Sequence, residues 1–371
     1  MTTPAYSVAR LAAPRVAAHL ERHRSAQPAH ARAVAPLPDP AAIEAMIDAG
    51  FWASLRREEG YVPKISLAYL PPTPDVHPLR FARPLTLDPG GLTKLAPAVE
   101  RPGIHLGVWD NEVWGATRTI PPFCFVVEVV APGLLVLKHR PRQESRKFVN
   151  IAVLQGDQVK MVDETASAIA DCPGLLTSLL GFDTPSEDIN VLVQLAVSMR
   201  RHGRGGALLV VPSAREEWLY SIVQPISYEV TPSYKDLAQL IAIEKQDPSD
   251  PDWLDDLARA VDALAGLTAV DGATVINDRF ELLAFGAKIR RKSGGESAEQ
   301  LIVTEPIEGS VAQRVHPGQL GGTRHLSAAQ FVKDQRDALA LVASQDGHFT
   351  IFAWSPCEDA VHAHRVEVLL L

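Results

Sequence analysis

Two short segments of this chain carry the residue types that phosphate chemistry needs. The first begins with Asp271, Gly272 and Ala273 and continues into the apolar run Thr274–Ile276, which is typical of a buried strand. A carboxylate at a strand end can hold a divalent metal, and a glycine lets a ligand approach the backbone closely. An Asp-Gly pair is also common in plain turns, so a simple turn stays open as the alternative.

The second segment, Gly321–Ser327, opens an expected helix. Glycines are followed by the hydroxyl of Thr323 at the expected cap and by Arg324 and His325. Unpaired backbone N–H groups and the helix dipole favour phosphate at such a helix start, and an arginine adds planar bidentate donors. The alternative is an ordinary N-capped helix with a surface arginine.

Taken together, the two segments are more informative than either one alone. A metal-holding acid and a phosphate-binding helix start are the parts that phosphoryl or nucleotidyl transfer requires, because that chemistry depends on positioning and charge neutralisation. The sequence therefore predicts that Asp271 and Arg324 converge on one polyphosphate.

The elements that must position these residues alternate between strands and helices. Helical spacing or capping signals predict helices over 189–203, 234–245, 253–267 and 326–338. Apolar runs predict strands over 206–212, 273–278, 281–289, 301–307, 339–345, 348–354 and 364–371. This pattern predicts an α/β (α+β) domain over 188–371, with a mixed sheet and helices on both faces.

The preceding part of the chain has a different character. After an N-terminal helix and linker at 1–39, an apolar stripe through Ile43, Met46 and Ile47 predicts a helix, and short β-branched and aromatic runs follow from Lys64 to Val162. These runs, at 64–72, 105–109, 123–130, 133–139 and 148–156, predict a smaller, mostly β domain over 40–187.

Bulk composition excludes several classes of protein. The chain has 371 residues, 46% of them hydrophobic, which suits two globular domains. Its net charge of -8 disfavours nucleic-acid binding, and no apolar run approaches the roughly 18 residues of a membrane span. Three scattered cysteines, Cys124, Cys172 and Cys357, form neither a disulfide framework nor a zinc motif, so we expect a cytoplasmic protein.

Five blocks of the C-terminal half carry a family resemblance. In order they are RGGALLVV, ISYEVTPSYKDL, DGATVIND, GGTRHLSAA and LALVASQDG. They resemble the diadenylate cyclase domain, whose signatures are a DGA motif and an RHR motif preceded by Gly-Thr, over about residues 190–355. The resemblance implies that Asp271 ligates Mg²⁺ or Mn²⁺ and helps activate the attacking 3′-hydroxyl, with Gly272 and Ala273 lining the nucleotide pocket.

The same resemblance implies further site residues and a reaction. Arg324 and His325 would act with Asp271 in catalysis, and the other ATP-binding residues would be Gly322, Thr323, Ser327 and Ser344. The implied reaction condenses two ATP into cyclic di-AMP plus two pyrophosphates. Each 3′-hydroxyl must attack the α-phosphate held by the other domain, so the resemblance implies a face-to-face homodimer.

Three positions depart from the family pattern. Leu326 stands where the third residue of the RHR motif would be cationic, Gln345 replaces the acid that commonly follows the serine, and Val270 replaces a common histidine. Loss of one charge-assisted contact costs about 1.5–3 kcal/mol. A catalytically weakened relative that acts as a nucleotide-binding sensor or regulatory scaffold is therefore the alternative function.

The N-terminal domain resembles, by its placement, the DACNV-like sensor domains that accompany such cyclases in bacteria, which implies an unknown small-molecule signal. Within it, His105, Trp109 and Trp114 flank a hairpin that would either form an aromatic pocket or pack as core. Elsewhere, His362 and His364 share one face of an expected strand, as a metal pair or, as we expect, a surface or edge pair.

Overall fold

The computed structural model of the chain divides into two compact units, and each is considered by itself. One unit ends at Asp163, and the second extends to Leu370. The structure describes residues 5–25, 35–72, 78–101, 103–141, 148–163, 190–242 and 250–371. The boundary predicted at 187/188 falls at residues outside these ranges and stays a prediction.

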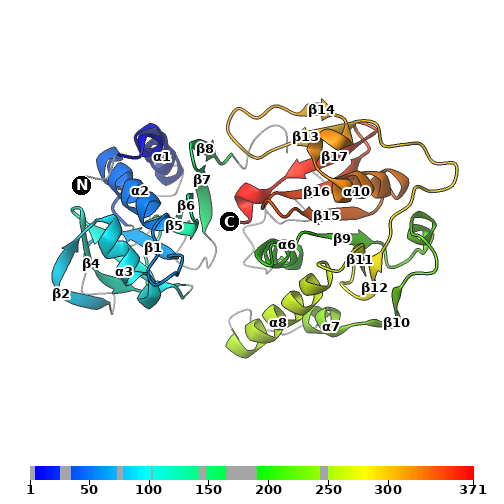
Figure 1. Cartoon of the computed structure of the whole chain (residues 1–371), viewed down its shortest axis with the longest axis horizontal. Helices are drawn as coiled ribbons and strands as arrows, with labels where there is room; N and C mark the ends of the chain where they lie inside the picture. The colour runs from blue at the N-terminus through cyan, green and yellow to red at the C-terminus, as the bar shows by residue number, and fades with distance from the viewer. Residues whose placement is uncertain are drawn as a thin grey trace. The chain divides into compact units, whose positions relative to one another are not determined.

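The first unit is built on an eight-stranded sheet (Figure 1). Its strands are β1 (Ile65–Tyr69), β2 (Leu79–Thr86), β3 (His105–Trp109), β4 (Glu112–Thr117), β5 (Phe125–Ala131), β6 (Leu134–His139), β7 (Val149–Gln155) and β8 (Gln158–Met161). They lie in the order β2-β4-β3-β1-β5-β6-β7-β8, and β1 and β3 run parallel whereas the other pairs are antiparallel. The predicted strands of this domain are confirmed.

Three helices cover one face of this sheet: α1 (Ser7–Ser25), α2 (Pro40–Ser54) and α3 (Pro89–Val99). The predicted apolar stripe of α2 is buried, with Ile43 and Ile47 fully inaccessible. The N-terminal helix α1 packs against α2 and contributes Val16 and Leu20 to the same core. Burial of these apolar side chains is what holds the helices on the sheet.

The second unit is built on a nine-stranded mixed sheet. Its strands are β9 (Gly206–Val211), β10 (Tyr228–Tyr234), β11 (Ala273–Asn277), β12 (Leu282–Ala287), β13 (Leu301–Thr304), β14 (Gln313–Val315), β15 (Leu339–Ala343), β16 (Phe349–Ser355) and β17 (Ala360–Arg365). They lie in the order β10-β12-β11-β9-β15-β16-β17-β13-β14. The helices are α6 (Val191–Arg201), α7 (Asp236–Ala242), α8 (Pro251–Leu267), α9 (Pro317–Leu320) and α10 (Thr323–Asp334), and short 3₁₀ turns lie at η1 (Glu217–Ser221) and η2 (Glu367–Leu369).

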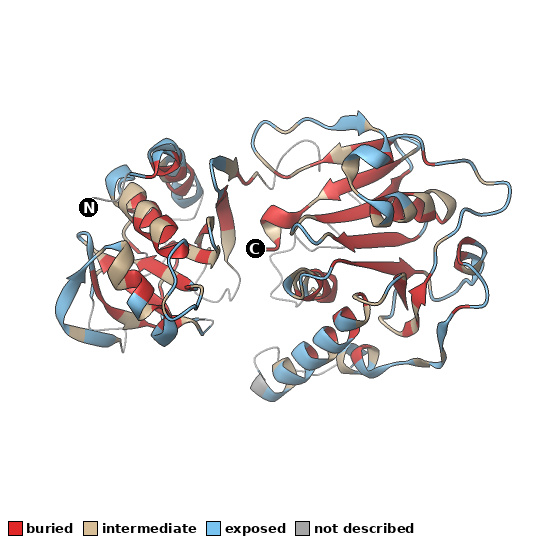
Figure 2. Cartoon of the chain, viewed as in Figure 1, coloured by how far each residue is buried: buried red, intermediate tan, exposed pale blue. Residues whose placement is uncertain are grey.

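Helices cover both faces of this sheet, as predicted. In β9, Leu208 and Val210 join the core beneath α6 and α8, whereas Leu209 and Val211 join the core beneath α10. This alternation follows from the two-residue period of a strand, and it explains why β9 and β15 are continuous apolar runs, red along their length in Figure 2. In the described part of the chain, none of the helices has the length and hydrophobicity needed to cross a bilayer.

Two local predictions were wrong or incomplete. The strand predicted over 364–371 ends instead at Arg365, and the apolar residues after it form η2, where Val366 and Leu370 pack into the core beneath α6. Helix α3 was not predicted, because Gly90, Gly91 and Pro97 have low helix propensity. Its start nevertheless carries a helix signal, since Asp88 caps the first turn by accepting from the N–H groups of both glycines.

Candidate functional site

Five strand ends meet at one edge of the second sheet. Strands β9 and β11 are parallel and start there, with Thr274 opposite Leu208. Strand β15 runs antiparallel to β9 and ends there, with Ala343 opposite Gly206. The following strands, β16 and β17, therefore start and end at the same edge, where Thr350 pairs with Arg365.

The pleat puts the polar residues of this edge on the face that α10 covers. Ala273, Ala363 and Phe352 all pack into the core beneath α10. Because side chains alternate along a strand, Arg365 and Thr350, which lie two residues from Ala363 and Phe352, point to that same face. The guanidinium of Arg365 therefore lies on the side of α10, and Asp271 lies in the bend that precedes β11.

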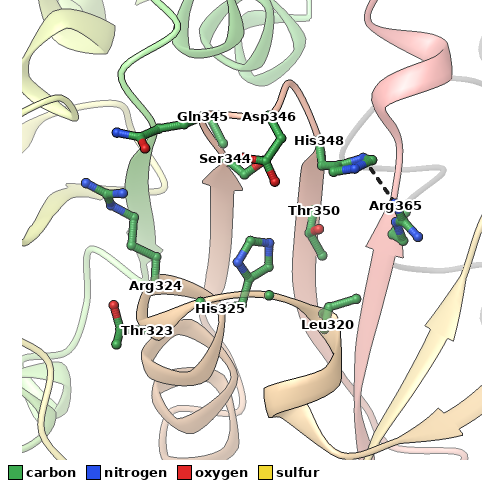
Figure 3. A pocket seen from close by; sticks show the side chains of 13 residues that line it. Leu320, Thr323, Arg324, His325, Ser344, Gln345, Asp346, His348, Thr350 and Arg365 are labelled. Carbon is green, nitrogen blue, oxygen red and sulfur yellow. Dashed lines mark hydrogen bonds between the residues drawn. The ribbon is translucent and has the colours of Figure 1, made fainter. Parts of the chain in front are cut away.

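The start of α10 forms one wall of a pocket at this edge (Figure 3). Its N-cap is Gly322, which makes no side-chain capping hydrogen bond, so the prediction that the Thr323 hydroxyl caps the helix was wrong. Among the described residues, no side chain accepts a hydrogen bond from the first backbone N–H groups of α10. These N–H groups are therefore available to an anion. The residues that line the pocket are Leu320, Gly321, Gly322, Thr323, Arg324, His325, Ala343, Ser344, Gln345, Asp346, His348, Thr350 and Arg365.

His325 forms the centre of the pocket floor. It is 5% exposed, and its ring stands edge-on to Phe352 with centroids 6.0 Å apart. A Cβ at Gly321 would lie 2.4 Å from His325 Nδ1, so the glycine is required for the ring to fit. Burial lowers the pKa of His325, and the charges of His348 and Arg365 lower it further. The imidazole is therefore held neutral, with one nitrogen able to donate and one able to accept.

Asp271 does not line the pocket; it precedes β11, whose start lies next to the start of β9. Its side chain is 91% exposed and forms an ion pair with Lys288. The hydrogen bond that Lys288 Nζ donates to Asp271, together with the charge of Lys288, lowers the pKa of Asp271. The charge of Arg324 contributes in the same direction. Arg324 itself reaches toward the start of β9, since a Cβ at Gly205 would lie 3.1 Å from its Nη1.

The described residues at this edge offer isolated carboxylates rather than a preformed metal centre. No group of three or more His, Cys, Asp or Glu side chains that could hold a metal occurs among the described residues. The carboxylates near the start of α10 are Asp346, which lines the pocket, and Asp271, which precedes β11. One carboxylate together with substrate phosphates and water is a common way to hold Mg²⁺.

The two residues after Asp271 serve the fold in a way that the sequence did not indicate. Gly272 has φ +113, and a Cβ there would lie 2.4 Å from the carbonyl carbon of Gly286, so the missing side chain admits the neighbouring strand β12. The expected reason, close approach of a ligand, is not the one that this contact shows. The methyl group of Ala273 packs into the core beneath α10.

The remaining predicted residues divide between the pocket and its surroundings. Gly322, Thr323 and Ser344 line the pocket, and the Ser344 Oγ is buried without a hydrogen-bond partner among the described residues. Ser327 lies in the second turn of α10, half-buried and outside the lining. Leu326 is 39% exposed and is also outside the lining.

The lining also contains polar residues that the sequence did not single out: Asp346, His348, Thr350 and Arg365. They come from the β15–β16 turn and from β16 and β17, and only strand pairing brings them next to α10. The alternation of side chains along β17 could have identified Arg365, since it is two residues beyond Ala363. The sequence, however, predicted a strand over 364–371, so it did not show that Arg365 is the last residue of its strand.

Other expected sites have structural roles. Trp114 is buried and donates from Nε1 to the Leu70 carbonyl at 2.8 Å, so it packs as core. Cys124 is fully buried, and burial raises the pKa of its thiol. His362 and His364 lie on an interior strand and are 5% and 4% exposed, so the expected surface or edge pair was wrong; His364 Nδ1 instead hydrogen bonds to Thr304 at 2.6 Å.

Comparison with known proteins gives one family match. Residues 32–118, which lie in the first unit, match the family "Probable sensor domain DACNV". No curated protein matches the chain significantly. A solved structure described as a hypothetical membrane spanning protein from Bacillus cereus is 15% identical and covers 52% of this chain and 70% of that chain; its TM-score of 0.27 supports no conclusion. Residues 32–118 are therefore similar to this probable sensor domain.

Proposed function

We propose that the second unit is a diadenylate cyclase, which joins two ATP molecules into cyclic di-AMP and releases two pyrophosphates, and that the DACNV domain regulates it. The observation that carries this proposal is that Arg324 reaches the start of β9, next to the start of β11 that Asp271 precedes, while α10 begins without a side-chain cap. The ordered cyclase motifs and the neighbouring sensor domain support it.

The site residues have roles that suit this reaction. The first N–H groups of α10 and Arg324 would bind the triphosphate. His325, held neutral by burial, would donate a hydrogen bond to a phosphate oxygen. Asp271 would orient the attacking 3′-hydroxyl and, with the phosphates, hold Mg²⁺ or Mn²⁺, which supplies charge neutralisation.

The reaction also requires a partner. The 3′-oxygen of each ribose forms a bond to the α-phosphorus of the other ATP while that phosphorus loses pyrophosphate. Two copies of the site must therefore face each other across a two-fold axis, so that each holds one ATP in line for attack.

A nucleotide-binding regulator without turnover is the second candidate. Leu326 and Gln345 depart from the cyclase pattern, and Gln345 Nε2 donates to the Arg204 carbonyl at 3.3 Å instead of presenting an acid. The ion pair of Lys288 with Asp271 also competes with a metal for the carboxylate.

Product analysis distinguishes the two. Purified protein is incubated with ATP and Mg²⁺ or Mn²⁺, and cyclic di-AMP is sought by chromatography, with Asp271→Asn as the test variant. Asp256→Asn, which removes an exposed carboxylate on α8 that pairs with Arg259, is the matched control. The cyclase predicts product from the wild type and the control but not from the test variant. Binding of ATP without product supports the regulator. ATP at 100 times its Kd should stabilise either by about 2.7 kcal/mol, so the absence of a thermal shift contradicts both.

A further inference from the structure

The pocket extends away from Asp271 to a second guanidinium that no sequence motif includes. Arg365 is the last residue of β17 and points to the α10 side of the sheet. It lines the pocket together with His348 (Figure 3), which precedes β16. Arg324 lies at the opposite end, so the pocket has a cationic group at each end.

Neighbouring side chains hold Arg365 in place through one of its three guanidinium nitrogens. Its Nη2 lies 3.1 Å from His348 Nδ1 and 3.4 Å from Glu367 Oε1. Glu367 Oε1 is also 3.1 Å from His348 Nδ1, so the carboxylate anchors both. A guanidinium has five N–H donors, and within the described residues the contacts of Arg365 involve Nη2 alone. The N–H groups on Nε and Nη1 of Arg365 can therefore bind an anion in the pocket.

The separation of the two arginines selects an extended ligand. The Arg324 guanidinium lies at the start of β9, and β17 is three strands away in the sheet. At about 4.8 Å between neighbouring strands, this is roughly 14 Å, more than one phosphate group can bridge.

Between the two arginines lie two polar side chains, His325 and Ser344, which both line the pocket. The Ser344 Oγ is buried and has no hydrogen-bond partner among the described residues. A buried polar group without a partner costs free energy, so the Ser344 hydroxyl indicates a ligand with a polar group at this point of the pocket.

We infer that Arg365, positioned by Glu367 and His348, binds the terminal phosphates of a nucleoside triphosphate whose α-phosphate lies at the Asp271 end. The nucleotide rests on the proposed function, whereas the polyphosphate subsite stands on the pocket alone. The inference also accounts for Leu326: its side chain lies outside the lining, and β17 supplies the second guanidinium instead.

Calorimetry on the full chain tests the subsite. Tripolyphosphate, ATP, ADP and AMP are titrated into the wild type, Arg365→Gln and the control Arg215→Gln. Arg215 is also an exposed arginine paired with a carboxylate, Asp337, but it lies outside the pocket. We expect Arg365→Gln to weaken tripolyphosphate and ATP by about tenfold or more, to leave AMP unchanged, and so to reduce the preference for ATP over AMP.

The outcomes separate the subsite from the cyclase. Unchanged affinity of Arg365→Gln for tripolyphosphate and ATP overturns the inference, even if the wild type makes cyclic di-AMP. Weakened affinity in a protein that makes no cyclic di-AMP upholds the subsite and overturns the cyclase. If Arg365→Gln does not fold, Arg365→Lys is used in its place, because lysine lacks the planar guanidinium that binds phosphates through two donors. If Arg365→Lys prefers ATP over AMP as strongly as the wild type does, the inference is overturned.

Discussion

Replacement of Gly272 by alanine tests whether the glycine of the DGA motif serves the fold or a ligand. The new Cβ would lie 2.4 Å from the carbonyl carbon and 2.6 Å from the carbonyl oxygen of Gly286, and both are backbone atoms that cannot rotate away. Gly272 also has φ +113, a conformation that side chains rarely adopt. The hairpin of β11 and β12 must therefore shift.

The cost follows from these two effects. A strained φ costs about 1–3 kcal/mol and overpacking a further 1–3 kcal/mol, so we expect Gly272→Ala to lower the free energy of unfolding by about 2–6 kcal/mol. In a domain of this size, that lowers Tm by on the order of 10 °C. Differential scanning fluorimetry without nucleotide measures it.

A matched substitution provides the control. Gly266 lies inside α8 with open space around its Cβ position, so Gly266→Ala should stabilise the protein by about 0.5–1 kcal/mol through helix propensity. An unchanged Tm for Gly272→Ala, combined with loss of ATP binding, would refute the packing argument and restore the ligand as the reason for the glycine.

Three further outcomes follow from the electrostatics and burial. Lys288→Met should raise the pKa of Asp271 toward its ordinary value, since the Lys288 hydrogen bond and charge are the main causes of its depression; a carboxyl NMR titration that shows no change would contradict this. Iodoacetamide should modify exposed Cys357 in the native protein and spare Cys124, whose thiol is buried, and mass spectrometry of the native protein would expose the opposite order. Burial, aided by the charge of His362, lowers the pKa of His364 to about 3, whereas the unfolded chain protonates near 6.5; this group's stability contribution is therefore complete above pH 6.5 and declines as the pH falls toward 3. Urea titrations across that range should show a shallower decline for His364→Asn than for the wild type, and equal slopes would contradict the assignment.

Alternation and helical periodicity were sufficient to predict most of the second sheet. Runs such as Leu339–Ala343 are apolar throughout because helices cover both faces, and that pattern is visible without coordinates. The convergence of Asp271 and Arg324 on one polyphosphate was predicted from chemistry and stays a prediction. Arg324 reaches the start of β9, and strand pairing puts the start of β11, which Asp271 precedes, next to it.

What the sequence could not provide was information carried by distant pairing. Gly272 is explained by Gly286, a contact across the hairpin whose closeness depends on backbone geometry. Arg365 reaches the pocket only because β17 is antiparallel to β16, and the apolar residues after it concealed where the strand ends. These features depend on register, which local composition does not specify.

A crystal structure of the protein with a non-hydrolysable ATP analogue and Mg²⁺ would examine the shared edge itself. We expect the triphosphate within hydrogen-bond distance of the first N–H groups of α10 and of Arg324, with its α-phosphate at the Asp271 end. An analogue bound with its phosphates away from both Asp271 and Arg324 would show that these residues do not serve one nucleotide.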